Sequence, residues 1–384
     1  MTIKTFVHSI HHQLQTHLSG SPIKKSHIYE LFAAAFGFKS YAALKSCSVF
    51  WKKQPEYPID PLDINAVMSR YISLGYPAGK ASVVSSNIID FLNESLLVAI
   101  KLSDLIVALY GTPWASLPDY DVEDEDIESG YKASLYHDSQ SLIWGDYNTG
   151  EPEYVLLSEL DAKAKQGDAL AHFALAIVYE QQDQDSPEGS EYWYRQTKIG
   201  RKLVGADKEL AEAYALHLER DGKYNYHLRE AARLGLPEAM LELGKRFEDP
   251  IFFDQDVPPF DCNPMAIAEL AEELYREEDA KKWLTIAAEK GDTSAMRRLI
   301  EDHDSDDLQK CWVWFYLAKL CGDDLSEDHL YAIHEDGSLY DDDIGGNAFV
   351  DGRFGVRLDP LSQKNDAAAR IKAKNLFSSL PAHR

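Results

Sequence analysis

The sequence contains only four cysteines, and their positions exclude several kinds of site. Cys47, Cys262, Cys311 and Cys321 are widely spaced along 384 residues and include no CxxC pair. Cysteines at short spacing are the usual ligands of structural zinc, and a dense set of them is typical of small disulfide-stabilised folds. The pattern predicts neither, and it indicates a reducing compartment.

Long apolar runs are also missing. The first residues, MTIKTFVHSIHHQLQ, include no apolar stretch followed by small residues, as a secretory signal would. The most apolar run, residues 95–110, is interrupted by Lys101 and Asp104, and a membrane-spanning helix needs about 18 or more apolar residues. We therefore expect a soluble, cytoplasmic protein that does not contact a membrane.

Positive charge is scarce and unevenly placed. The chain has 39 Lys and Arg against 64 Asp and Glu, a formal net charge of −25. This balance argues against a protein whose whole surface binds nucleic acid or an anionic membrane. Residues 1–60, however, contain seven lysines and only three acidic residues, and no arginine precedes Arg70. The N-terminal part is therefore electrostatically distinct from the rest.

Motifs of catalysis and of nucleotide binding are absent. The sequence contains no GxxxxGK[ST], GxGxxG, GxSxG or HExxH. His137-Asp138 and His303-Asp304 resemble fragments of an acid–base pair, but neither has a nucleophile motif beside it. We predict that the chain is not an enzyme and needs no cofactor; a hydrolase within residues 120–156 is the weakest alternative.

Two polar clusters are candidates for metal binding, and neither has the required pattern. His8, His11, His12 and His17 lie close together without a Cys or Glu to complete a site. The acidic run DYDVEDEDIESG lacks the glycine and the terminal glutamate of a calcium loop. We interpret the histidines as an exposed polar face and residues 118–130 as a solvated acidic linker, so no metal is predicted.

The sequence does contain a recurring helical pattern, which is clearest in DAKKWLTIAAEKGDTSAMRRLIED, residues 279–302. Trp283, Ala287 and Ala288 fall on one face of a helix. Gly291 can end that helix in the left-handed conformation, and the aspartate after it can cap the next helix, which brings Ala295 onto the apolar face. Small residues allow the two helices to approach closely. The stretch predicts a helical hairpin.

The same spacing returns along the chain. Trp314 and Phe315 belong to one further copy, and Trp193 and Tyr194 to a degenerate one. The turn glycines are separated by 33, 35, 56 and 31 residues, and they are Gly167, Gly200, Gly235, Gly291 and Gly322. A period near 34, apart from one insertion around the prolines of residues 250–264, predicts hairpins that stack as an α-helical solenoid.

These segments resemble Sel-like repeats of bacterial proteins, relatives of the tetratricopeptide repeat, over residues 157–334. The resemblance implies a right-handed superhelix of helical hairpins whose concave face binds other proteins, without catalysis. Most repeat aromatics are expected in the core. The candidates for partner contact are Trp193, Tyr194, Phe315, Asp341, Asp342 and Asp343.

Other segments flank the predicted array. Residues 1–55 read as a small helical module, 60–117 as helical, 131–156 as a small β element, and 335–384 as a β-hairpin followed by a capping helix. Within residues 347–358, Asp351-Gly352 is a favoured two-residue hairpin turn. The closing helix is expected from Asp366 to Ser379.

The sequence therefore predicts a mostly α-helical protein with two functional alternatives. The first is a scaffold or adaptor whose acidic repeat array binds a protein or peptide through basic or polar contacts. The second is a DNA-associated regulator, because a helix, Gly37 and a second helix lie beside lysines in residues 1–55 and permit a helix-turn-helix interpretation. Nucleic acid is expected as a partner only through that module.

Overall fold

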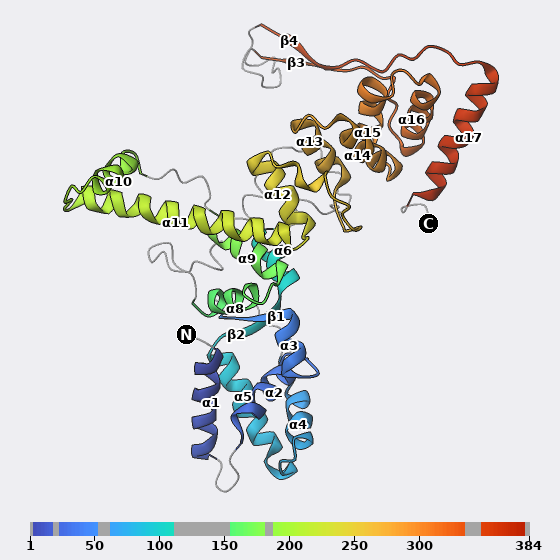
Figure 1. Cartoon of the computed structure of the whole chain (residues 1–384). Helices are drawn as coiled ribbons and strands as arrows, with labels where there is room; N and C mark the ends of the chain where they lie inside the picture. The colour runs from blue at the N-terminus through green and yellow to red at the C-terminus, as the bar shows by residue number, and fades with distance from the viewer. Residues whose placement is uncertain are drawn as a thin grey trace. The chain divides into compact units, whose positions relative to one another are not determined.

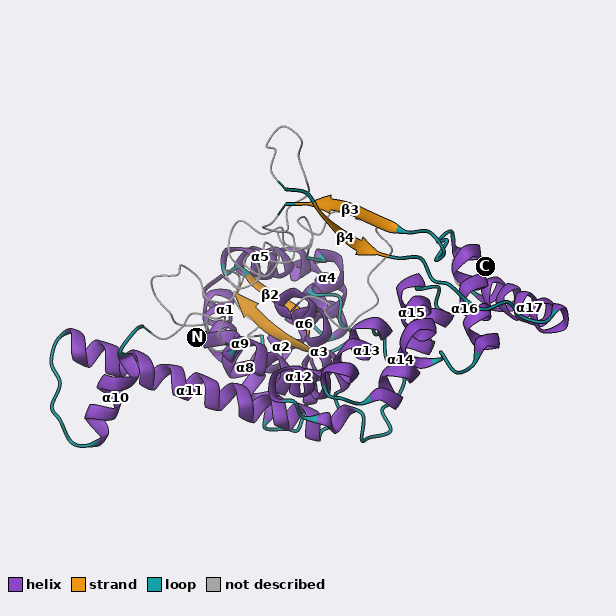
Figure 2. Cartoon of the chain, turned by 90° about the horizontal axis from the view of Figure 1, so that it is seen from above, coloured by secondary structure: helices purple, strands orange, loops and turns teal. Residues whose placement is uncertain are grey.

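The computed structural model describes residues 3–17, 23–52, 62–110, 154–180, 187–334 and 347–380. Most of these residues are helical, as the sequence predicts, and two small antiparallel sheets accompany the helices (Figure 2). Contacts divide the chain into two compact units, one up to Asp249 and the other from Pro250 (Figure 1). The division falls inside the predicted array, at the start of its proline-containing insertion.

Several predictions concern residues outside this description. They include the acidic linker 118–130, the cluster Asp341, Asp342 and Asp343, and residues 131–153 of the expected β element. The last three residues of that element, 154–156, begin a helix instead of a strand.

The N-terminal helices of the first unit share one hydrophobic core. These helices are α1 (Ile3–His17), α2 (Lys25–Ala35), α3 (Tyr41–Cys47), α4 (Ile64–Ser73) and α5 (Ala81–Glu94), with a short 3-10 turn at Ala78–Lys80. Phe6, Ile10 and Leu14 recur at helical spacing in α1 and are buried. They meet Tyr71 of α4 and Ile88 of α5 in the same cluster. Residues from both predicted segments, 1–55 and 60–117, therefore fold together.

A two-stranded sheet interrupts the two N-terminal segments that the sequence predicts to be helical. Strand β1 (Ser48–Lys52) pairs antiparallel with β2 (Leu97–Lys101), and α6 (Leu102–Tyr110) follows at once. The helical expectation was wrong at β2, because a short continuous apolar run fits a buried strand as well as a helix. Leu96, with φ of 53°, separates α5 from the strand.

The described remainder of the first unit is mostly helical. Its helices are α8 (Tyr154–Ala164), α9 (Ala169–Tyr179), α10 (Ser190–Lys198), α11 (Ala206–Arg233) and α12 (Pro237–Phe247). At 28 residues, α11 is roughly 42 Å long. Its N-terminal part packs on α10 and its C-terminal part on α9 and α12 (Figure 1). One continuous helix thus takes part in two of the predicted hairpins.

The five turn glycines share one backbone geometry. Their φ angles lie between 82° and 106°. In each turn the glycine N–H donates to the carbonyl three residues earlier, and the next N–H donates to the carbonyl five residues before it. This is the Schellman arrangement that ends helices. Within the predicted array, Tyr275, with φ of 56°, makes the same pair of bonds at a sixth turn, which the glycine pattern could not reveal.

The second unit contains a compact group of helices. They are a 3-10 turn at Pro250–Phe252, α13 (Pro264–Glu273), α14 (Glu277–Glu289), α15 (Thr293–Arg298), a π-helical stretch at Leu299–His303, α16 (Leu308–Cys321) and α17 (Gln363–Ser379). Ala287, Ala288 and Ala295 are buried around the Gly291 turn, where the Asp292 carboxylate accepts from the Ala295 N–H at 2.8 Å. The closing helix α17 packs on α16 through Ala369 and Ala373.

The C-terminal β prediction was wrong in its pairing. Strand β4 (Phe349–Arg353) runs straight through Asp351 and Gly352 and pairs antiparallel with β3 (His329–Ile333). Gly352 lies opposite Leu330 instead of forming a hairpin turn. Gly322 ends α16, but a strand follows where the repeat pattern would place a helix. The two strands form a ribbon that extends away from α15–α17 (Figures 1 and 2).

Candidate functional site

Aromatic side chains gather on α10 and the facing part of α11. The Tyr192 and Trp193 rings are 5.0 Å apart and nearly perpendicular, and the Tyr194 ring lies 5.3 Å from that of Tyr214 on α11. Trp193 and Tyr194 are partly exposed, Tyr192 is 53% exposed and Ile199 is 76% exposed. We call Tyr192, Trp193, Tyr194, Ile199 and Tyr214 the α10 patch.

Cations lie against the aromatic faces of the α10 patch. Lys198 Nζ is 4.8 Å from the centre of the Tyr194 ring, and the guanidinium carbon of Arg201 is 5.4 Å from the Trp193 ring. Residues 190–202 contain four cations and one carboxylate, Glu191, which pairs with Arg195 at 2.5 Å. Residues 190–202 are therefore basic, although the chain as a whole and the first turn of the facing helix α11 are acidic.

Phe315 belongs to a different cluster, in the second unit. Its ring lies 5.2 Å from Trp312, whose indole N–H donates to the Asp359 carbonyl at 2.8 Å. Both rings are partly buried against the unit's hydrophobic core. Phe315 thus shares no cluster with Trp193 and Tyr194, and its contacts are those of a core residue.

Trp283 and Trp314 also have structural surroundings. Trp283 is half-buried, with its ring 5.9 Å from Phe252. Trp314 is buried, and its indole N–H donates to Asp304 Oδ2 at 3.1 Å. The other Asp304 oxygen is 2.9 Å from Lys281 Nζ and 3.6 Å from Lys310 Nζ. Asp304 therefore ties α14 to α16.

The His303-Asp304 pair does not form an acid–base unit. His303 Nε2 lies 3.7 Å from Glu272, whereas Asp304 faces the lysines and Trp314. Burial would raise the pKa of Asp304, but hydrogen bonds from Lys281 and Trp314 outweigh it and hold that pKa below its usual range. The carboxylate is kept ionised, as a structural ion pair requires.

A small cavity adjoins this ion pair between α14, α16 and α17. Its volume is about 140 Å³, and it is lined in part by Lys281, Asp304, Lys310 and Lys372. Sites for drug-sized molecules usually have roughly 300–1,000 Å³. The cavity is too small for a typical cofactor or metabolite.

The N-terminal histidines lie on α1 without a metal-binding arrangement. His8 Nδ1 is 3.1 Å from Lys25 Nζ, and His11 Nε2 is 3.2 Å from Gln15 Nε2. His12 is exposed, and the side chain of His17 lies outside the described residues. Over the whole described chain, no three His, Cys, Asp or Glu side chains come together as metal ligands.

Two lysines of the N-terminal module lie near a partly buried carboxylate on α8. Burial raises the pKa of Glu159 on α8, and the charges of Lys45, Lys163 and Lys4 oppose that rise. Lys163 is itself buried and donates to the carbonyls of Lys45 and Ser46 at 2.6 and 3.2 Å. Lys4 and Lys45 are exposed, and their charges partly offset the effect of burial on Glu159.

A histidine pair joins α9 to α11, and no sequence motif pointed to it. The Nδ1 atoms of His172 and His227 are 3.0 Å apart, and His172 Nε2 donates to the Ala164 carbonyl at 3.1 Å. A His172 ring that carries its one proton at Nε2 accepts at Nδ1 from His227. Burial, followed by the charge of His172, lowers the pKa of His227 to about 4.

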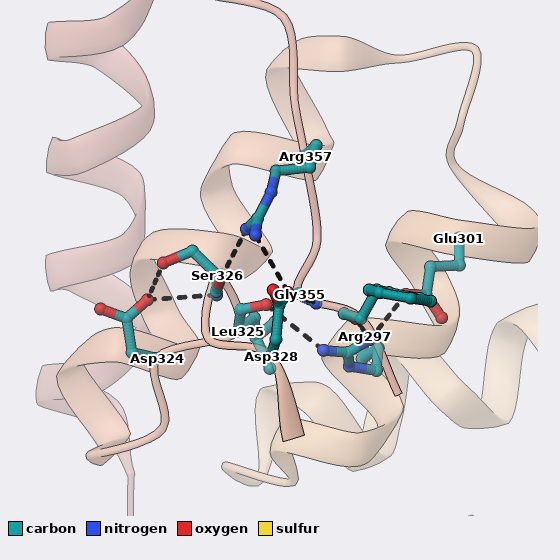
Figure 3. A network of polar contacts seen from close by, with 9 residues as sticks. Arg297, Glu301, Asp324, Leu325, Ser326, Asp328, Gly355 and Arg357 are labelled. Carbon is teal, nitrogen blue, oxygen red and sulfur yellow. Dashed lines mark hydrogen bonds and ion pairs between the residues drawn. The ribbon is translucent and has the colours of Figure 1, made fainter. Parts of the chain in front are cut away.

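A polar network fixes the base of the β3–β4 ribbon (Figure 3). The buried Arg297 of α15 donates to Glu301 at 2.8 Å and to the carbonyls of Phe354 and Leu325 at 3.0 and 3.3 Å. On the neighbouring strand segment, Asp328 accepts from the Gly355 N–H at 2.7 Å. Arg357 also donates to Asp328, at 3.0 Å, and to the Ser326 carbonyl.

Comparison of the chain with protein-family models, with curated proteins and with solved structures found no match. Among the residues that the structure describes, no helix is long and apolar enough to cross a membrane.

Proposed function

We propose that this chain is a protein-binding adaptor, built largely from Sel-like helical hairpins, and that its partner contacts the α10 patch. The observation that carries the proposal is the group of exposed Tyr192 and partly exposed Trp193 and Tyr194, with Arg201 against the Trp193 ring and Lys198 against the Tyr194 ring. Tyrosine, tryptophan and arginine are the residues that contribute most to protein–protein affinity. Their concentration on one short helix suits a binding surface better than a core.

The patch favours a particular kind of partner. Its cations complement carboxylates, and its rings accept an apolar or aromatic side chain. The partner segment should therefore present an apolar anchor beside acidic residues. The net charge of the whole chain instead favours a basic partner. Salt screens charges that lie more than about 8–10 Å from the binding surface, so the charges beside the α10 patch should decide which partner binds there.

Paired captures from native lysate test the proposal. The bait is the full-length chain, compared with a Trp193→Ser, Tyr194→Ser variant. Tyr275→Gly is the matched control, because Tyr275 is an aromatic residue of the second unit and is 93% exposed. A protein captured by wild type and by the control, but lost from the double variant, supports the proposal. Equal capture by all three chains would place binding elsewhere.

The DNA-associated alternative predicts a different result. Contacts between lysine and phosphate release counterions, so binding to duplex would fall steeply with salt. Because α1–α5 share one core, the test uses the full chain or the whole first unit instead of residues 1–55 alone. We expect no duplex shift at low salt. A salt-sensitive shift that is reduced by Lys24→Gln with Lys39→Gln would favour the regulator.

A further inference from the structure

The β3–β4 ribbon is two strands wide and exposes large apolar side chains. Leu330 is 43% exposed, Tyr331 48%, Val350 75% and Phe354, directly after β4, 73%. A two-stranded ribbon alone is at best marginally stable in water. Within the described chain, each strand also has one edge without a partner strand. Such edges are templates for pairing with another strand.

The free edge of β4 is chemically complementary to itself. It reads Val350-Asp351-Gly352-Arg353-Phe354, with opposite charges on either side of Gly352 and apolar residues beyond them. In an antiparallel pair of two such strands centred on Gly352, Asp351 of each copy faces Arg353 of the other. Val350 likewise faces Phe354. Opposite charges and apolar–aromatic neighbours are favourable cross-strand pairs, and two-fold symmetry makes each pair occur twice.

We propose that β4 pairs with β4 of a second copy of this chain, which joins the two ribbons into one four-stranded antiparallel sheet. The required groups are available. Arg353 is exposed and has no carboxylate within ion-pair distance in the described chain. Among the described residues, Asp351 accepts only from the adjacent Gly352 N–H, at 2.7 Å. Gly352, on the two-fold axis, has no side chain to separate the strands.

The base of the ribbon is fixed before pairing. Arg297 holds the Phe354 carbonyl, and Asp328 holds the Gly355 N–H just beyond β4. An edge that is already ordered loses less conformational entropy on association. The pairing segment therefore enters the interface in the conformation that it needs.

The edge of β3 is a poorer candidate. Two copies paired about Tyr331 would place His329 opposite Ile333 and Leu330 opposite Ala332, with no pair of opposite charges. Pairing β3 of one copy with β4 of the next would leave free edges at both ends and produce an open chain of molecules. Only β4 with β4 gives a closed dimer with matched charges.

Charge reversal in the full-length protein tests this pairing. Asp351→Lys makes both charged positions positive, and Arg353→Glu makes both negative. Sedimentation velocity over a wide concentration range should show a wild-type dimer and, for each variant alone, association weakened by about tenfold or more. An equimolar mixture of the two variants should recover the dimer, because each lysine or arginine then faces a carboxylate.

Comparison of Asp351→Lys with Asp359→Lys distinguishes strand pairing from the general repulsion between two acidic chains. Two chains of net charge −25 repel each other, so Asp351→Lys would strengthen association if only overall charge mattered. Asp359→Lys makes the same charge change on an exposed residue outside β4 and should dimerise at least as well as wild type. A wild-type chain that stays monomeric overturns the proposal. So does a dimer that tolerates Asp351→Lys, or a mixture of variants that stays monomeric.

Discussion

Tyr275 occupies a turn position that glycine holds at the other five turns of this geometry in the predicted array. Its φ of 56° lies in the left-handed region, and its side chain is 93% exposed. A residue with a Cβ is less stable there by about 1–2 kcal/mol, whereas glycine loses roughly 0.5–1 kcal/mol more conformational entropy on folding. Tyr275→Gly should therefore raise the free energy of unfolding by up to about 1 kcal/mol, measured by chemical denaturation.

Gly291→Val is the opposite substitution at an equivalent turn. Gly291 has φ of 106°, and an added Cβ would lie 3.5 Å from a methyl carbon of Leu380. Because valine is strained at positive φ, we expect a loss of roughly 1–2 kcal/mol. If Tyr275→Gly destabilised the protein, or Gly291→Val unfolded like wild type, the shared turn geometry would be disproved.

The His172–His227 pair makes stability depend on pH. The pKa of His227 is lowered from 6.5 to about 4 in the folded chain, so the unfolded chain binds more protons between these values. The contribution of the neutral His227 to the free energy of unfolding should be fully present above pH 6.5 and should decline as the pH falls toward 4. His227→Gln should lose less stability than wild type as the pH falls from 6.5 to 4, because glutamine can donate to His172 without titrating; denaturation midpoints of both chains measure this.

An exposed histidine is the control for this measurement. His12 lies on the solvent side of α1, and His12→Gln should leave the pH profile as it is in wild type. A His227→Gln profile with the same acid slope as wild type would show that the pair does not titrate as described.

The spacing of Ala, Gly and Asp in the sequence predicted where helices end and begin better than it predicted which side chains contact each other. The Ala-x-x-Gly-Asp pattern located the Gly291 turn and its Asp292 cap because both depend on local conformation. The bond from Trp314 to Asp304 and the His172–His227 pair join residues 10 and 55 positions apart. Such contacts depend on how helices pack, which a single sequence does not specify.

Helix α11 remains continuous across Asp221-Gly222, a dipeptide that more often marks a turn. Lys223 pairs with Glu219 at 2.7 Å, and Lys208 with Glu212 at 3.4 Å, both at helical spacing. Gly222 has a helical backbone, and an added Cβ would meet no atom within 4 Å. Gly222→Ala should stabilise the protein by roughly 0.5–1 kcal/mol. A loss of thermal stability would indicate that α11 bends or breaks at this point.

The base of the ribbon depends on Arg297. Arg297→Met keeps the aliphatic part of the side chain but removes the bonds to Glu301, Leu325 and Phe354. Removing charged hydrogen bonds at a buried position should cost about 1.5–3 kcal/mol. Hydrogen exchange should accelerate in residues 329–333 and 349–354 more than in α1–α5.

Gly355→Ala provides a second test of the same contact, because an added Cβ would collide with the Ser326 carbonyl. It should loosen the same strands. Unchanged exchange in both variants would contradict the account of the ribbon's anchorage.

Strand pairing was the weakest part of the sequence-based prediction. Partners β1 and β2 are separated by 44 residues, and β3 and β4 by 15. Turn chemistry at Asp351-Gly352 suggested a local hairpin, but Gly352 instead lies where a side chain would strike the His329 carbonyl. Glycine in a strand marks either a turn or a close backbone approach, and only the fold distinguishes these uses.

At the scale of the whole molecule, net charge and local charge lead to different expectations. The chain carries −25, yet residues 190–202, which include most of the α10 patch, contain four cations and one carboxylate. Partner choice should follow the local charge, because solution salt screens the rest over about 8–10 Å. The predicted array is also divided between two units. We therefore propose that the partner binds one patch on one hairpin and not a continuous concave face.

Selection of peptides from a random library on the immobilised full-length chain, followed by fluorescence anisotropy, tests binding at the α10 patch most directly. The account predicts that enriched peptides combine an apolar or aromatic residue with neighbouring carboxylates. Replacing Trp193 and Tyr194 with serine should weaken their affinity by about tenfold or more, whereas Tyr275→Gly leaves it unchanged. Enrichment of basic peptides, or equal affinity for the double variant, would contradict the proposed function.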